Sequence, residues 1–212
     1  MATRTGGALR ADAARNRERL VNAAREVFAE RGLDVSMRQI ARHAGVSEPT
    51  LRRRFPDREQ LVAEAFEDQI TRYADAAEEA AGEADPWTGF TEFVRRLARM
   101  QLADRGFTEV LTLTFPPALR AERQRRRAYA AITALIDRAK DDGSLRRDFS
   151  PEDLVLILIA HAGVVAAGGA LSEAFSDRLL AYLFEAFAAP GRGGLPPAPN
   201  VAETYRALLR LH

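Results

Sequence analysis

Residues 36–55, SMRQIARHAGVSEPTLRRRF, contain the start signals of two short helices separated by a glycine. Ser36 is a suitable N-cap for the first helix, and Gln39, three residues later, completes a capping box. Gly45 stands where the chain needs a residue with left-handed backbone angles. Ser47 can then cap the second helix. The stretch therefore predicts a helix–turn–helix pair.

The second of these helices carries three consecutive arginines at residues 52–54. Leu51 and Phe55 are four residues apart and face inward, so the arginines spread over the remaining surface. A helix of this size fits the major groove of B-DNA, and arginine suits both phosphates and guanine edges. An arginine run is also common on a solvated helix face, and helical hairpins occur in proteins that do not bind DNA. On this stretch alone, both interpretations stay open.

The charge of the chain is unevenly distributed. The net charge of the 212 residues is only +1. Residues 1–60 nevertheless hold 13 arginines and 8 acidic residues, a balance of +5, whereas residues 61–212 have a balance of −4. Basic and acidic parts on one chain indicate that the first part meets a polyanion such as double-stranded DNA.

Several function classes are excluded or disfavoured by composition. The chain has no cysteine, which excludes disulfides and thiolate metal sites. It has no apolar run of roughly 18 residues and no secretory signal, so we expect a cytoplasmic protein without membrane contact. No histidine follows a glutamate by three residues, and neither G-x-S-x-G nor a phosphate loop is present. We expect no enzyme, no metal and no cofactor.

The apolar residues recur at intervals of three and four, and strand patterns are absent, which predicts an all-α protein. The pattern divides the chain into a helix–turn–helix DNA-binding domain at residues 1–56, with a flexible N-terminal arm, and a helical regulatory and dimerisation domain at residues 57–212. Outside the central pair, helices are expected at about residues 12–31, 58–81, 86–103, 107–113, 117–141, 151–167, 172–188 and 201–211.

A longer set of residues extends the signal on both sides of the pair. The segments are VFAERG at 27–32, IA at 40–41, AGVS at 44–47, TL at 50–51 and FPDREQL at 55–61. In type and spacing they resemble the tetracycline-repressor (TetR) family of bacterial transcriptional regulators over about residues 15–62. The resemblance implies a three-helix DNA-binding head followed by a helical bundle that binds a ligand and dimerises.

Three arginines depart from the family pattern. The family usually has an aromatic residue at the position of Arg52, commonly a histidine at Arg54, and usually a lysine at Arg58. We expect Thr50 and Arg53 to lie nearest the bases, and the other members of the set to contact phosphates directly or through the backbone amides they expose. The predicted DNA contacts are Ser36, Ser47, Thr50, Arg52, Arg53, Arg54 and Arg58.

The helix expected at 151–167 is apolar on almost every side and must be covered on every side. It contains small residues that leave room for a partner backbone, although both it and the next helix could simply be monomer core. The resemblance implies a homodimer whose two-fold axis sets the spacing of the DNA half-sites. The predicted interface residues are Leu156, Ala160, Gly163, Val164, Ala167, Leu180, Phe184 and Phe187.

The middle helices are rich in aromatic residues, which would suit a pocket for a small apolar effector and would equally suit a plain core. The resemblance implies a repressor that a ligand releases from its operator by shifting the protein to a state whose heads no longer match the half-sites. The alternative is a helical interaction or scaffold protein without specific DNA binding. The predicted ligand contacts are Trp87, Phe90, Phe93, Met100, Gln101, Phe107, Phe115 and Tyr129.

Overall fold

The computed structural model describes residues 4–112, 119–191, 193–199 and 203. The described residues form ten α helices and one short 3-10 turn, without a strand, so the predicted all-α class is confirmed. The helices are α1 (Arg4–Arg31), α2 (Met37–His43), α3 (Glu48–Arg54), α4 (Arg58–Ala65), α5 (Glu67–Ala81), α6 (Pro86–Ala103), α7 (Arg105–Thr112), α8 (Leu119–Asp141), α9 (Pro151–Gly168) and α10 (Ser172–Phe187).

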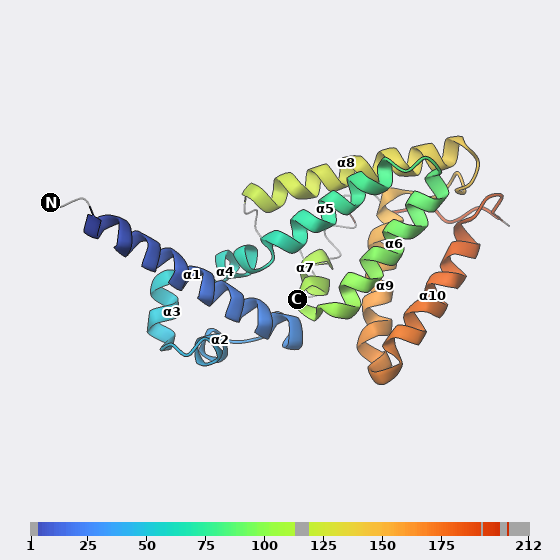
Figure 1. Cartoon of the computed structure of the whole chain (residues 1–212). Coiled ribbons are helices and arrows are strands. Elements are labelled where there is room, and N and C mark those ends of the chain that lie inside the picture. Colours follow the sequence, from blue (N-terminus) through green and yellow to red (C-terminus); the bar gives the residue numbers. More distant parts are fainter. Residues whose placement is uncertain (1–3, 113–118, 192, 200–202, 204–212) are drawn as a thin grey trace.

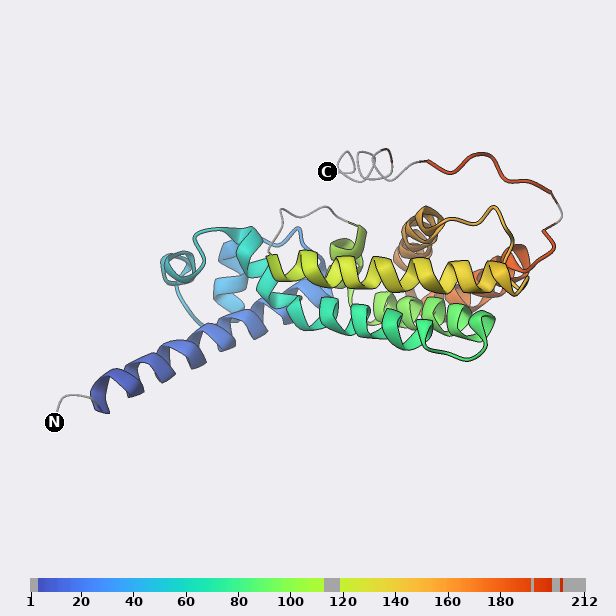
Figure 2. The same ribbon diagram turned by 90° about the horizontal axis from the view of Figure 1, so that it is seen from above.

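The helices form a head and a body (Figure 1). The head consists of α1 to α4 at one end of the molecule, and the body consists of α5, α6, α8, α9 and α10. Helices α5 and α8 lie side by side along the length of the body, as Figure 2 shows from above. Helix α7 lies where the head meets the body and contacts α1, α6 and α9.

Two clusters of buried apolar side chains hold the molecule together. The cluster of the body joins α5, α6, α8, α9 and α10. The cluster of the head joins α1 to α4 and also includes Phe107 and Val110 of α7. Because α4 and α7 contribute to it, the core of the head draws residues from both sides of position 56. The division into domains at that position stays a prediction.

Helix α7 packs against the head at very short range. A Cβ atom added at Gly106 would lie 2.7 Å from the carbonyl oxygen of Phe28 and 2.7 Å from the ring of Phe66. The amide of Leu33 also donates a hydrogen bond to Glu109 Oε2 at 2.6 Å. The end of α1 is therefore attached to α7 by both close packing and a charge-assisted hydrogen bond.

Two predicted helix boundaries were wrong. Helix α1 begins at Arg4 rather than near Asp12, because residues 8–11 (ALRA) favour helix and allow it to continue towards the N-terminus. The helix predicted at 58–81 is divided at Phe66, whose backbone has φ −110° and ψ 6°. The Phe66 ring is fully buried 6.0 Å from that of Phe28, so tertiary packing overrides the local pattern there. The helix predicted at 201–211 lies outside the described residues.

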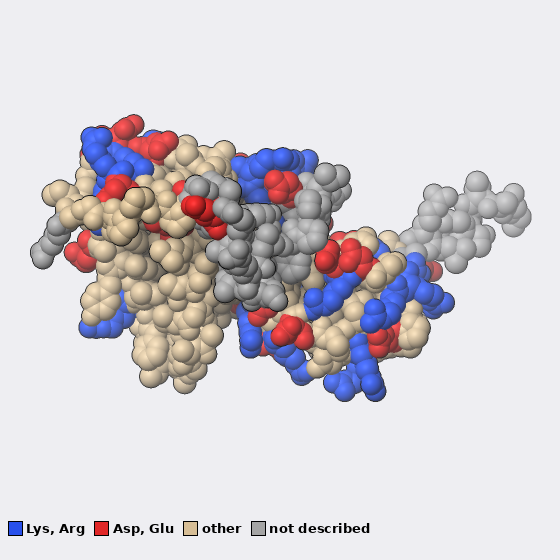
Figure 3. All heavy atoms as spheres, turned by 180° about the vertical axis from the view of Figure 1, so that it is seen from behind, with Lys and Arg blue, Asp and Glu red and all other residues tan. Residues whose placement is uncertain are grey.

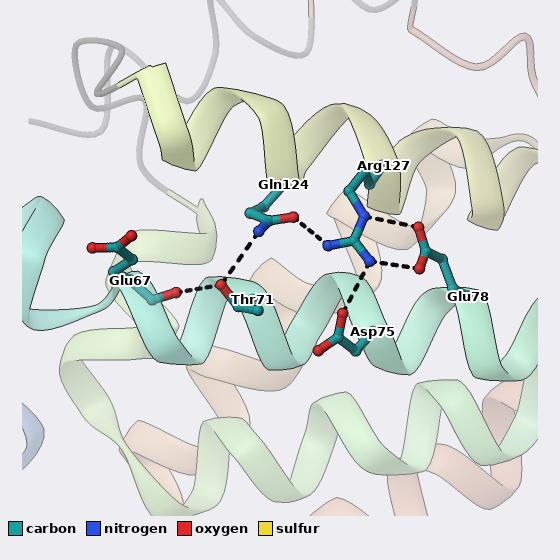
Figure 4. A network of polar contacts seen from close by, with 6 residues as sticks. All are labelled: Glu67, Thr71, Asp75, Glu78, Gln124 and Arg127. Atoms are coloured by element: carbon teal, nitrogen blue, oxygen red, sulfur yellow. Dashed lines mark hydrogen bonds and ion pairs between the residues drawn. The ribbon is translucent and has the colours of Figure 1, made fainter.

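A polar network fixes the register of α8 on α5 (Figure 4). Arg127 of α8 donates to both carboxylate oxygens of Glu78, at 2.9 and 2.5 Å, and to Asp75 at 3.0 Å. These hydrogen bonds raise the pKa of Arg127 and lower that of Glu78. Gln124, which also bonds Arg127, reaches Thr71 on α5. Arg127 is directed at α5. Arg125 and Tyr129, two residues before and two residues after it in α8, therefore lie on a different face of the helix.

We expect Gly106→Ala to destabilise the protein by about 1–3 kcal/mol, because the added methyl group must displace the backbone of α1. Alanine has the higher helix propensity, so a loss of stability would report the steric contact and not the helix. Urea unfolding of the full chain measures this, with Gly194→Ala as the control because open space surrounds Gly194. Equal stabilities of the two variants would show that α7 and α1 do not pack as described.

Candidate nucleic-acid interface

The helix–turn–helix pair has the predicted local geometry. The amide of Ser36 donates to Gln39 Oε1 at 2.9 Å, and the amide of Gln39 donates to Ser36 Oγ at 3.3 Å, which confirms the capping box. Gly45 has φ +67°, a left-handed conformation that other residues adopt only with strain. The turn between α2 and α3 is thereby fixed by local chemistry.

Helix α3 is anchored by Leu51 and Phe55, both of which are fully buried in the head. The side chains of residues 52–54, the three arginines, are all exposed. This arrangement follows from the helical period, because two anchors one turn apart leave the intervening residues on the outer surface. The predicted orientation of the arginines is confirmed.

Polar contacts within α3 hold part of this surface in place. Arg52 Nε donates to Glu48 Oε1 at 2.8 Å, one turn earlier in the helix. Ser47 Oγ and Thr50 Oγ1 lie 2.8 Å apart, and Arg53 Nη2 lies 3.4 Å from the same Thr50 oxygen. Arg54 has no ion pair within the part of the chain that the structure describes. The arginines are thus solvated or weakly held within their own helix.

Arg17 of α1 braces α3, and sequence reasoning missed it. Its guanidinium lies 4.1 Å from the centre of the Phe55 ring and donates to the carbonyl oxygen of Arg54 at 3.1 Å. It also forms two hydrogen bonds to the carboxylate of Glu64 on α4, at 2.9 and 2.5 Å. One side chain therefore connects three helices. No sequence signal identified it, because its partners are 37 to 47 residues away.

Arg58, a predicted phosphate contact, is half-buried at the start of α4. Its Nη2 donates to the carbonyl oxygen of Val35 at 3.1 Å, and its guanidinium lies 5.8 Å from the ring of Phe28. Asn16 of α1 was not predicted, yet it lines a surface hollow together with Thr50, Arg53 and Arg54. Asn16 and Arg17 of α1 therefore both lie beside the exposed surface of α3.

The two ends of the molecule differ in charge. Figure 3 shows Arg side chains gathered on the head, whereas the end formed by α9 and α10 is mainly uncharged. Such a charge distribution attracts the phosphate backbone to the head. The outward-facing arginines and this distribution together make the head a candidate DNA interface.

A separate cavity of about 220 Å³ lies in the body, between α5, α6, α7, α8 and α9. Of the predicted ligand contacts that the structure describes, only Tyr129 lines it. The lining residues are Ile70, Tyr73, Leu97, Val110, Leu111, Arg125, Tyr129, Ile132, Pro151, Glu152, Leu154, Val155 and Leu158.

The other aromatic residues predicted to contact a ligand pack against protein. Trp87 stacks on Phe90 at 5.9 Å, and Phe90 packs edge-on against Phe149 and Phe187. Phe93 lies 6.1 Å from Tyr73 in the core of the body, although it does not line the cavity.

The remaining members of the predicted ligand set are distributed over both cores. Phe107 belongs to the core of the head, and Met100 packs against the cores of both head and body. Phe115 lies outside the described residues. Gln101 is buried and forms hydrogen bonds, so its polar atoms are occupied by protein.

Gln101, His161 and Ser176 form a buried chain of hydrogen bonds across α6, α9 and α10. Gln101 Nε2 donates to the carbonyl oxygen of Leu158, so its Oε1 accepts from His161 Nδ1 at 2.7 Å. His161 Nε2 then accepts from the Ser176 hydroxyl at 2.8 Å. Burial lowers the pKa of His161. His161 is therefore a hydrogen-bonded residue of the core.

The predicted interface residues fall into two groups. The α9 residues Leu156, Ala160, Gly163 and Ala167 are exposed, and Leu156 has 65% of its surface accessible. Val164 is half-buried. In contrast, the α10 residues Leu180, Phe184 and Phe187 are buried within the chain itself. The exposed large apolar residues of α10 are instead Phe175 and Tyr182, which were not predicted as interface residues.

Two family models match the chain and together cover most of it. The model described as "Bacterial regulatory proteins, tetR family" matches residues 20–65, and "Transcriptional regulator SbtR-like, C-terminal domain" matches residues 85–186. The chain belongs to the TetR family. It is therefore a DNA-binding transcriptional regulator of the kind that responds to small ligands.

Solved structures of TetR-family regulators are similar to this member over most of their length. One, SCO0520 from Streptomyces coelicolor, is 29% identical, covers 82% of this chain and 99% of its own, and has a TM-score of 0.51. A regulator from Mycobacterium vanbaalenii is 30% identical with coverages of 85% and 99% and a TM-score of 0.48. A third, from Marinobacter aquaeolei VT8, has 21% identity, coverages of 84% and 98%, and a TM-score of 0.57. No curated protein matches the sequence.

We expect the stability of this TetR-family protein to fall as the pH decreases from 7.5 to 5.5. The pKa of His161 is lowered in the folded state, so the unfolded chain binds more protons below its ordinary pKa of about 6.5. The stabilisation is present above that pKa and is lost below it. Urea unfolding at both pH values measures the effect.

The matched control for this pH dependence is a pair of histidine variants. His161→Gln removes the titrating group and should flatten the dependence in this range, whereas His43→Gln on the exposed surface of α2 should retain it. A dependence that survives in His161→Gln would contradict the assignment.

Proposed function

We propose that the protein is a homodimeric repressor that binds a double-stranded DNA operator with α3 in the major groove and leaves it when a small molecule binds the body. The observation that carries this proposal is the placement of the arginines of α3 on an outer surface whose inner side is anchored by Leu51 and Phe55. We assign DNA binding to residues 1–56 and regulation and dimerisation to residues 57–212.

Within the interface, we assign base contacts to Thr50 and Arg53 and phosphate contacts to Arg52 and Arg54. Arg52 has to exchange Glu48 for a phosphate, which makes its contribution dependent on salt. Ser36 and Ser47 begin α2 and α3, where amides at the start of each helix are available to phosphates. We assign Arg58 a supporting role at the same surface, because Val35 and Phe28 hold it at the head.

We propose that the exposed apolar surface of α9 and α10 is covered by a second copy of the chain. Leu156, Phe175 and Tyr182 are exposed there, and Gly163 leaves open space for an approaching backbone. The expectation that no apolar run reaches roughly 18 residues was wrong, because the segment Pro151–Phe187 has a window long and apolar enough for a membrane span, with 17% of that window buried. The chain reverses between α9 and α10 into a hairpin, and family membership favours a dimer and a cytoplasmic location.

Helix α7 supports ligand control of the head. Val110 and Leu111 line the cavity of the body, while Gly106 of the same helix packs against Phe28 of α1 and Glu109 accepts a hydrogen bond from Leu33, just after α1. A ligand that displaces α7 therefore acts on the head directly. Such a ligand shifts the population of head positions only to the extent that it binds one arrangement better than the other.

Two competing functions are not favoured. A scaffold protein without specific DNA binding does not account for the match to regulator models in both halves of the chain. TetR-family regulators are generally non-enzymatic, and we propose no catalytic activity.

We expect Arg53→Ala to reduce the preference of the protein for its operator over random DNA, because a bidentate contact to a guanine contributes about 1–3 kcal/mol of discrimination. Arg54→Ala should instead weaken binding to both DNAs by a similar factor, because a phosphate contact carries no sequence information. Fragments selected from the source genome supply the operator, and fluorescence anisotropy at several salt concentrations measures both affinities. Equal losses on operator and random DNA for both variants would refute this division of roles.

We expect Leu156→Glu to convert the dimer to a monomer, because a charge placed in an apolar interface loses its hydration without gaining a partner. Operator affinity should fall with it, since a single head contacts only one half-site. Sedimentation equilibrium measures the assembly. The control is Ala134→Glu, at an exposed position of α8 outside the proposed interface. An unchanged dimer in Leu156→Glu would place the interface elsewhere.

A further inference from the structure

The cavity in the body is mainly apolar but contains one cation. Leucine, isoleucine and valine side chains form most of its wall, and Arg125 of α8 lies among them. Arg125, Tyr129 and Ile132 reach the cavity together because they are spaced four and three residues apart on one helix. The network around Arg127 fixes the orientation of that face of α8.

Arg125 is only weakly satisfied by the protein. It is half-buried, and its one hydrogen bond within the described residues is a long contact of 3.4 Å from Nη2 to the carbonyl oxygen of Val110. It forms no ion pair in the described part of the chain. A guanidinium removed from water without a carboxylate partner is costly, and a bidentate anion would offset that cost. Arg125 is therefore available to bind an anionic group that enters the cavity.

Tyr73 of α5 adds a second hydrogen-bond donor to the same cavity. Burial raises the pKa of Tyr73 to about 12, although the charge of Arg125 acts in the opposite direction. The hydroxyl therefore stays protonated at neutral pH, and no described residue forms a hydrogen bond with it. A donor of this kind suits a carboxylate oxygen.

The remaining features of the cavity restrict the ligand further. A volume of about 220 Å³ is below the roughly 300–1,000 Å³ of pockets for drug-sized molecules, so the ligand is compact. Glu152, the one acidic residue of the lining, is half-buried in the first turn of α9, where the helix dipole favours its negative charge. A dianion would meet repulsion from Glu152, which favours a single negative charge on an apolar body.

We propose that this cavity binds a compact monocarboxylic acid, with its carboxylate at Arg125 and the Tyr73 hydroxyl and its apolar body against the aliphatic wall. The proposal rests on the proposed function in taking this cavity as the effector site, and it adds the chemical class of the effector. It also suggests how the ligand affects the head. A carboxylate that binds Arg125 displaces the hydrogen bond from Arg125 to Val110 of α7, and α7 also holds the end of α1.

The test is calorimetric titration of the full-length protein with three acids, benzoate, cyclohexanecarboxylate and hexanoate, each compared with its neutral amide. We expect at least one acid to bind about tenfold or more tightly than its amide, because hydrogen bonds to charged groups are the stronger ones. Arg125→Gln should abolish this preference, and Tyr73→Phe should weaken acid binding several-fold. Glu152→Gln should strengthen it by removing a like charge.

The control is Arg123→Gln, which removes a charge from an exposed position of the same helix outside the cavity. It should leave the preference for acids intact, and thermal unfolding checks that each variant is folded. If no acid binds more tightly than its amide, or if Arg125→Gln retains the preference, the inference is overturned. In a parallel assay, acid binding that depends on Arg125 without any change in operator affinity would support the site and refute release by ligand. Release from the operator by a neutral molecule, and by no acid, would support release by ligand and refute the carboxylate site.

Discussion

The burial of Leu51 and Phe55 in the core of the head is the contact on which the DNA-binding surface depends. Helix α3 has only seven residues, too few for a stable helix in isolation, so packing has to hold it in place. Arg17 adds to this packing by covering the Phe55 ring and bonding the end of α3 to α4. With the inner side so constrained, the arginines at 52–54 have only the outer surface available.

Close packing of α7 also connects the head to the body. Helix α7 contributes Phe107 and Val110 to the core of the head, and Val110 and Leu111 to the wall of the cavity. Gly106 permits an approach to α1 that a larger residue would prevent. Because packed interiors are dense and transmit strain, a displacement of α7 at the cavity wall also strains its contacts with the head. The DNA-binding head and the cavity of the body thereby share one helix.

The polar groups inside the body are of two kinds. Gln101, His161 and Ser176 are hydrogen-bonded to one another and to the carbonyl oxygen of Leu158 and join three helices, so they specify packing. With respect to the described residues, Arg125 and Tyr73 keep unused hydrogen-bonding capacity at the edge of an apolar space. This difference, more than aromatic content, distinguishes the proposed ligand site from the core. It explains why the ring cluster of Trp87 and Phe90 is structural, although its composition suggested a ligand pocket.

The sequence by itself determined the helical class, the capping box, the turn at Gly45 and the outward arginines, because each follows from local chemistry or from spacing along one helix. The resemblance of residues 15–62 to known regulators indicated the family. Only the tertiary structure decided the break at Phe66, the brace at Arg17 and the position of the cavity. These depend on residues that are distant in sequence, and a helical pattern identifies which face is apolar without identifying what covers it. For α10, Leu180 and Phe184 proved to face their own chain, whereas Phe175 and Tyr182 face outward.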